Sequence, residues 1–147
     1  MTPRIKFGLI AGIIGLVINT CVSAALGICG PFTALLAGAT AGFFAAQQEK
    51  ATTRGDGARL GAISGSIAGA LVLIGQLIGV LGVLILVQIS DIAPIFGEIP
   101  SPSADIAQQA VYYISGLGTG VCFGLVGVIV AALAGAGAGY LGTPEPS

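Results

Sequence analysis

The sequence predicts an all-α integral membrane protein that folds as a four-helix bundle built from two helical hairpins. Of its 147 residues, 55% are hydrophobic and 7% are charged, whereas a soluble domain carries roughly 25% charged residues. The charges fall in a few short clusters that separate long apolar runs. Glycine, with 25 residues, recurs at every fourth position within these runs, which is typical of closely packed membrane helices. The length suits a single transmembrane domain, residues 1–147.

The first two spans lie between Phe7 and Gln48, a stretch that contains no charged residue. A transmembrane helix needs about 20 apolar residues, so this stretch is too long for one span and suits two short ones. Pro31 marks the break between them, because proline cannot continue a helix from the preceding turn. We therefore expect spans at approximately 7–28 and 32–47, joined by a tight turn.

Two longer apolar runs supply the third and fourth spans, at approximately 59–89 and 106–141. Both exceed the hydrocarbon core of about 30 Å, since a helix rises about 1.5 Å per residue. These helices must therefore tilt, kink or project past the bilayer, and we favour projection of the fourth on the side of Asp105. A loop at 48–58 then joins spans two and three, and an acidic, proline-containing loop at 90–105 joins spans three and four.

The basic residues predict the orientation of the chain. All five of them fall on one side of this topology, namely Arg4, Lys6, Lys50, Arg54 and Arg59. By the positive-inside rule that side is cytoplasmic. We therefore expect both termini and the 48–58 loop in the cytoplasm, with the 90–105 loop outside, in a prokaryotic plasma membrane. A cleaved signal peptide is the alternative interpretation of the first apolar run, but the run continues past any cleavage point, so we expect an uncleaved anchor.

Rows of glycine predict how the helices pack. Residues four apart share one helix face, so each row forms a groove without side chains in which two backbones can approach closely. A glycine inside a helix costs up to about 1 kcal/mol relative to alanine, and we expect close contact to offset that cost in a glycine-zipper arrangement. The predicted helix-packing residues are Gly38, Gly42, Gly57, Gly61, Gly65, Gly69, Gly116, Gly120, Gly124, Gly135 and Gly139. Whether they face the same chain or a neighbouring one stays open at this point.

An internal match links the second and fourth spans. Residues 36–43 (LAGATAGF) resemble residues 133–140 (LAGAGAGY). Both segments lie near the cytoplasmic end of a span that runs from outside to inside, so a duplication would relate the two hairpins as a parallel repeat. Chance similarity is the alternative in a chain so rich in glycine and alanine.

Reactive groups are missing from the interior of every predicted span. The chain has no histidine, and its acidic and basic residues lie at span ends or in loops. Ionisable groups inside a membrane usually mark proton relays and ion pathways, so the sequence argues against proton-coupled carriers, rotary ring subunits and voltage sensors. We expect no enzymatic activity, no cofactor and no metal site. The net charge of −1 gives no basis for nucleic-acid binding.

The remaining polar candidates are two amides and three cysteines. Asn19 and Gln76 fall at similar depth, near the middle of the bilayer. Either they form an interhelical hydrogen bond, worth about 0.6–2 kcal/mol, or they line a narrow pore for a neutral solute; we favour the hydrogen bond. Cys21 and Cys122 also share a depth, and we expect both to be small buried packing residues rather than a disulfide. Cys29, near the outer end of the first span, is placed to pair with another subunit if that side is oxidising.

The glycine-rich spacing of four spans is similar to that of mitochondrial inner-membrane translocase subunits, and by size alone the chain resembles small fluoride channels and small multidrug carriers. The multidrug carriers depend on a membrane glutamate that no predicted span supplies, so these resemblances imply no site residue. We expect a non-enzymatic structural or accessory subunit that contacts membrane lipid and packs into a homo-oligomer or with other membrane subunits. The alternative is a passive channel or small-solute facilitator, and a lipid-organising protein is a third hypothesis.

Overall fold

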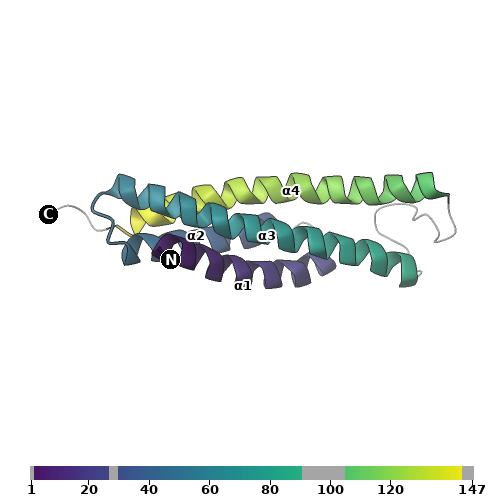
Figure 1. Ribbon diagram of the computed structural model, residues 1–147, viewed down its shortest axis with the longest axis horizontal. Helices are drawn as coiled ribbons and strands as arrows, with labels where there is room; N and C mark the ends of the chain where they lie inside the picture. The colour runs from purple at the N-terminus through teal and green to yellow at the C-terminus, as the bar shows by residue number, and fades with distance from the viewer. Residues whose placement is uncertain (1, 27–29, 91–104, 144–147) are drawn as a thin grey trace.

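The computed structural model describes residues 2–26, 30–90 and 105–143. Almost all of them belong to four α-helices: α1 (Pro3–Leu26), α2 (Gly30–Gln48), α3 (Arg54–Ser90) and α4 (Ile106–Leu141). The helices pack lengthwise against one another (Figure 1), which confirms the predicted all-α fold of four packed helices. Most of the predicted outer loop, together with Cys29, lies outside the described residues.

α1 and α3 begin earlier than the predicted spans, because polar residues extend them beyond the apolar runs, whereas α4 begins at Ile106 as predicted. α1 starts at Pro3, a residue well suited to a first turn since the N–H it lacks would have no helical partner there. α3 starts at Arg54 rather than near 59, and Thr53 explains this start. The Thr53 hydroxyl accepts a hydrogen bond from the Asp56 backbone N–H at 3.1 Å and donates one to the Asp56 carboxylate at 2.7 Å. This pair caps the helix.

α2 ends in a tight turn that leads into α3. The backbone N–H of Ala51 donates to the carbonyl of Ala46 at 3.2 Å, and that of Lys50 donates to the carbonyl of Gln47 at 3.3 Å. These bonds form a Schellman motif, in which the residue after the helix takes a left-handed conformation. That residue is Lys50, with a φ of 50°, at a position where glycine is usual because it has no Cβ.

The bundle has a rhombic cross-section in which α2 and α3 occupy the centre. Both contact each other and the two remaining helices, whereas the described parts of α1 and α4 do not contact one another. α2 runs parallel to α4, because Gly38 meets Ala131 and, one turn later, Gly42 meets Gly135. Similar contacts show that α1 runs parallel to α3. The two hairpins therefore point in the same direction.

The core consists of small side chains, and large apolar side chains face outward. The buried hydrophobic residues are Ala34, Ala37, Ala41, Ala45, Ala46, Ala68, Val72 and Ala131. Isoleucine, leucine and phenylalanine side chains are exposed along all four helices. A protein in water buries its large apolar side chains, whereas lipid solvates them and leaves close packing of small residues to hold helices together.

Three helical segments are long and apolar enough to cross a membrane: Pro3–Cys21, Arg54–Leu86 and Ile106–Leu141. α2 is not among them. It has 19 residues, and it begins with glycine and proline and ends with two glutamines, which lower its hydropathy. A protein with three membrane-spanning helices is thus supported, and crossing of the bilayer by α2 remains a prediction.

α3 and α4 extend far beyond α1 and α2 at one end of the molecule (Figure 1). α3 has 37 residues and α4 has 36, so each is about 55 Å long at about 1.5 Å per residue. α2 begins at the level of Gln76, whose side chain faces Gly30. α1 runs parallel to α3 and continues for seven residues past Asn19, which meets Gln76, so it ends level with about residue 83 of α3. Residues 84–90 and 106–116, where Gly116 faces Leu84, therefore form a two-helix extension, which we call the overhang. Its exposed side chains include Ile89 (76% exposed) and Ile106 (84%).

Candidate functional site

The closest backbone contacts lie between the glycines of α3 and those of α4. A Cβ atom built on Gly57 would lie 2.5 Å from the carbonyl oxygen of Gly139, and one built on Gly61 would collide with the carbonyl oxygen of Gly135. The contacts are reciprocal, because a Cβ on Gly139 would strike the carbonyl of Gly57. Since these obstacles are backbone atoms, they cannot rotate away as a side chain can. Only glycine fits this contact at the present helix separation.

Three helices converge at Gly135. Its backbone faces Gly61 of α3 on one side and Gly42 of α2 on the other, and a Cβ built on it would lie 3.1 Å from the carbonyl oxygen of Gly38. Gly65, one turn along α3, meets the next turn of α4 at Ala131. The centre of the bundle is therefore a place where three backbones touch with almost no side chain between them.

Further along α4, the predicted glycines accommodate side chains instead of backbone. The nearest atoms to a Cβ on Gly116, Gly120 and Gly124 belong to Leu84, Val80 and Leu73, at 2.9, 3.2 and 2.9 Å. All eleven predicted packing glycines thus face another helix of the same chain. Gly8, Gly12 and Gly75, which share the helical spacing of the others, lie equally close to neighbouring helices. Gly82, Gly118 and Gly137 face open space.

Asn19 and Gln76 meet in the interior, between α1 and α3. The Nδ2 group of Asn19 donates to Oε1 of Gln76 at 2.9 Å and to the carbonyl oxygen of Val72 at 3.1 Å. The two amide residues are 0% and 2% exposed. Within the described part of the chain, the Oδ1 atom of Asn19 is buried and accepts no hydrogen bond. Leaving such an acceptor without a donor costs about 1–3 kcal/mol.

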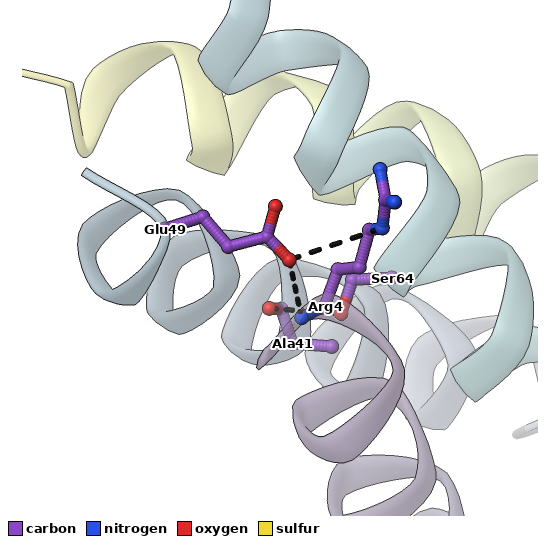
Figure 2. Close-up of polar contacts among 4 residues, drawn as sticks. All are labelled: Arg4, Ala41, Glu49 and Ser64. Atoms are coloured by element: carbon purple, nitrogen blue, oxygen red, sulfur yellow. Dashed lines mark hydrogen bonds and ion pairs between the residues drawn. The ribbon is translucent and has the colours of Figure 1, made fainter. Parts of the chain in front are cut away.

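Hydroxyl groups also link helices through backbone carbonyls. Ser64 of α3 is fully buried and donates to the carbonyl oxygen of Ala41 in α2 at 3.1 Å (Figure 2). Thr20 of α1 donates to Leu16 in its own helix at 2.8 Å and approaches the carbonyl of Gly75 in α3 at 3.3 Å. Like the two amides, these groups are neutral, and they cross-link helices.

The prediction that Cys21 and Cys122 are buried packing residues is wrong. Both side chains are exposed, and both cysteines are free. α1 and α4 occupy opposite corners of the bundle, so each turns a wide arc of its surface outward. The same arrangement keeps these two cysteines from pairing with each other, because the described parts of α1 and α4 make no contact.

Charged and aromatic side chains lie together at the end of the bundle where a turn joins α2 to α3. The carboxylate of Glu49 accepts a hydrogen bond from the backbone N–H of Arg4 at 2.9 Å and forms an ion pair with its Nε at 3.8 Å (Figure 2). The Arg54 guanidinium lies over the Tyr140 ring, 5.2 Å from its centroid. The rings of Phe7 and Phe44 stack at 5.7 Å.

Comparison of the chain with protein-family models, with curated proteins and with solved structures finds no match. The function must therefore be argued from the packing, the polar groups and the surfaces of the chain itself.

Proposed function

We propose that this protein is a non-enzymatic integral membrane protein that serves as a structural or accessory subunit of a homo-oligomer or a larger membrane complex. One observation carries the proposal: the overhang exposes apolar side chains beyond the point where α1 and α2 end. The glycine faces support it in another way. Because they are occupied within the chain, they make a rigid subunit whose remaining apolar surface is available to partners.

The length of α3 supports the need for a covering partner. About 20 residues of helix are needed to cross the hydrocarbon core. If the charged end lies at the membrane surface, the residues of α3 from Arg59 to Gly79 are enough to cross it. A helix of about 55 Å still extends about 42 Å along the bilayer normal at a tilt of 40°, the upper end of the usual range. The end of the overhang then lies outside the hydrocarbon. Its exposed apolar surface is disfavoured there by about 25 cal/mol per Å², and a protein partner would remove that penalty.

The test is the mass of the particle extracted from its membrane without detergent, in polymer-bound native discs. The expected result is a mass well above the 14.4 kDa of one chain. Combined substitution of Ile89→Thr and Ile114→Thr in the overhang should dissociate the assembly. Ile13→Thr, at an exposed position of α1, is the matched control and should leave it intact. A single chain accompanied only by lipid would contradict the proposal, as would equal dissociation by the control.

A second candidate function is a passive channel or small-solute facilitator at Asn19 and Gln76. The observation that favours it is the unpartnered Oδ1 atom of Asn19, an acceptor that a passing water or small neutral solute could satisfy. The pair is closed in this structure, so transport would require α1 and α3 to separate. Flux into liposomes that Asn19→Leu abolishes would support the channel, and absence of flux in the wild-type protein would eliminate it.

A further inference from the structure

A polar cleft opens at the charged end of the bundle, with a volume of about 330 Å³. Three separate segments form it: the start of α1, the turn after α2 and the first turns of α3. Its polar lining comprises Arg4, Glu49, Lys50, Thr52, Asp56 and Arg59. Three of the five basic residues of the chain thus line one concave surface.

The carboxylates of the cleft are already engaged, and this leaves an excess of positive charge. Glu49 interacts with Arg4 through the hydrogen bond and ion pair described above. Asp56 accepts hydrogen bonds from the hydroxyls of Thr52 at 3.3 Å and Thr53 at 2.7 Å, as part of the α3 cap. Among the described residues the Arg4–Glu49 contact is the single ion pair. Lys50 and Arg59 therefore have no carboxylate of the described residues within ion-pair distance.

The cations are also positioned to receive a ligand. Figure 2 shows the two terminal guanidinium nitrogens of Arg4 pointing away from Glu49, so that its Nε faces the carboxylate and its outer edge stays available. Lys50 stands in the left-handed conformation, where a Cβ is disfavoured. A chain with 25 glycines nevertheless has a lysine at this position. The Schellman motif accounts for the conformation, and the lysine adds a positive charge to the lining of the cleft.

We propose that this cleft binds the phosphate group of an anionic phospholipid. A basic concavity between helix ends, at the level where a bundle leaves the bilayer, is suited to an anionic headgroup. Leu60 also lines the cleft, and exposed apolar side chains occur near other lining residues in the chain: Ile5 follows Arg4 in α1, and Phe44 lies in the last turns of α2 before Glu49. Acyl chains could lie against these side chains while the phosphate meets the cations. A soluble phosphate would use only the charged half of this arrangement, so we assign a lipid. The inference is independent of the proposed assembly.

The experiment compares the retention of two lipids by the full chain in nanodiscs that contain equal amounts of phosphatidylglycerol and phosphatidylcholine, measured by native mass spectrometry. Wild-type protein should retain phosphatidylglycerol preferentially. Arg59→Gln and Lys50→Gly should each lower that preference about fivefold, the effect expected for one charge near a membrane surface. Lys50→Gly suits the left-handed turn, so its melting temperature should not fall, which separates lipid binding from folding.

Lys6→Gln is the matched control, because it also removes one positive charge from the same end of the bundle, at a residue outside the cleft. An equal loss of preference in this control would overturn the proposal in favour of a diffuse positive surface, and unchanged preference in both cleft variants would overturn it outright. Inorganic phosphate added to discs of pure phosphatidylcholine separates the two sources of phosphate. If the wild-type protein retains inorganic phosphate and Arg59→Gln abolishes this retention, the ligand is a soluble phosphate, and the lipid assignment is overturned.

Discussion

At the scale of single residues, the glycines of this bundle differ in what faces them. Gly61 faces the backbone of another helix, Gly124 faces a leucine side chain and Gly137 faces open space. A backbone atom cannot move without its helix, whereas a side chain can change rotamer. The effect of adding a methyl group should therefore depend on the neighbour and not on the glycine row itself.

Gly61→Ala should destabilise the protein by about 1–3 kcal/mol, because the new methyl group forces α3 and α4 apart. Gly137→Ala should be neutral or stabilise it by up to about 1 kcal/mol, because alanine is the better helix former and meets nothing. The measurement is the free energy of unfolding in mild detergent with increasing dodecyl sulfate. Destabilisation of similar size by both substitutions would contradict the packing described for Gly61.

The amide pair makes a second residue-scale prediction. Asn19→Ala should cost about 1–2 kcal/mol in unfolding free energy, because it removes a buried donor from Oε1 of Gln76 and from the carbonyl of Val72. The double variant with Gln76→Ala should cost less than the sum of the two single changes, with a coupling of about 0.5–2 kcal/mol. A double-mutant cycle in the same unfolding assay measures this coupling. Strict additivity would show that the hydrogen bond does not stabilise the bundle.

At the scale of elements, helix ends depend on local capping that hydropathy does not register. The apolar run predicts a third span from about residue 59, but the helix starts at Arg54 because Thr53 and Asp56 cap it. Gly57, the first glycine of the α3 row, thereby becomes part of the helix and reaches Gly139. The cap formed by Thr53 and Asp56 thus adds one turn to the contact between α3 and α4.

Thr53→Ala should destabilise the start of α3 by about 1 kcal/mol, the usual value of an N-cap. Thr53→Ser retains the hydroxyl and is the matched control. Hydrogen exchange of the backbone amides at residues 54–57 should accelerate in the alanine variant and stay slow in the serine variant. Equal exchange in both would mean that the cap does not hold this turn.

At the scale of the whole molecule, the antiparallel order of the helices brings the start of α1, the turn after α2 and the end of α4 to one end of the bundle (Figure 1). All five basic residues lie toward that end. By the positive-inside rule, we expect that end to lie in the cytoplasm. The opposite end is the overhang, where Asp105 precedes α4.

In a chain whose three cysteines are replaced by alanine, Thr52→Cys should react with an impermeant maleimide only after the cells are opened. Asp105→Cys should react in intact cells. The expectation follows from opposite ends of the bundle lying on opposite sides of the membrane. Labelling of Thr52→Cys from outside would reverse the orientation, and labelling of both from one side would contradict a bundle that spans the bilayer.

Hydropathy and residue spacing predict that the chain is helical and apolar, where charges interrupt it, and at which positions glycine recurs every fourth residue. These properties are local, because hydropathy and a spacing of four depend only on neighbouring residues. The amides Asn19 and Gln76 could also be matched in depth by counting residues along their helices.

Which helix faces meet is a property of the folded bundle. The fold places α1 and α4 at opposite corners, which exposes Cys21 and Cys122, and it assembles the cleft from Arg4, Lys50 and Arg59, residues of three separate segments. Periodicity gives each helix its faces but not its neighbours, because in lipid many faces are equally apolar and the choice among them depends on how closely particular backbones can approach. That approach is a property of pairs of helices, and no single stretch of sequence contains it.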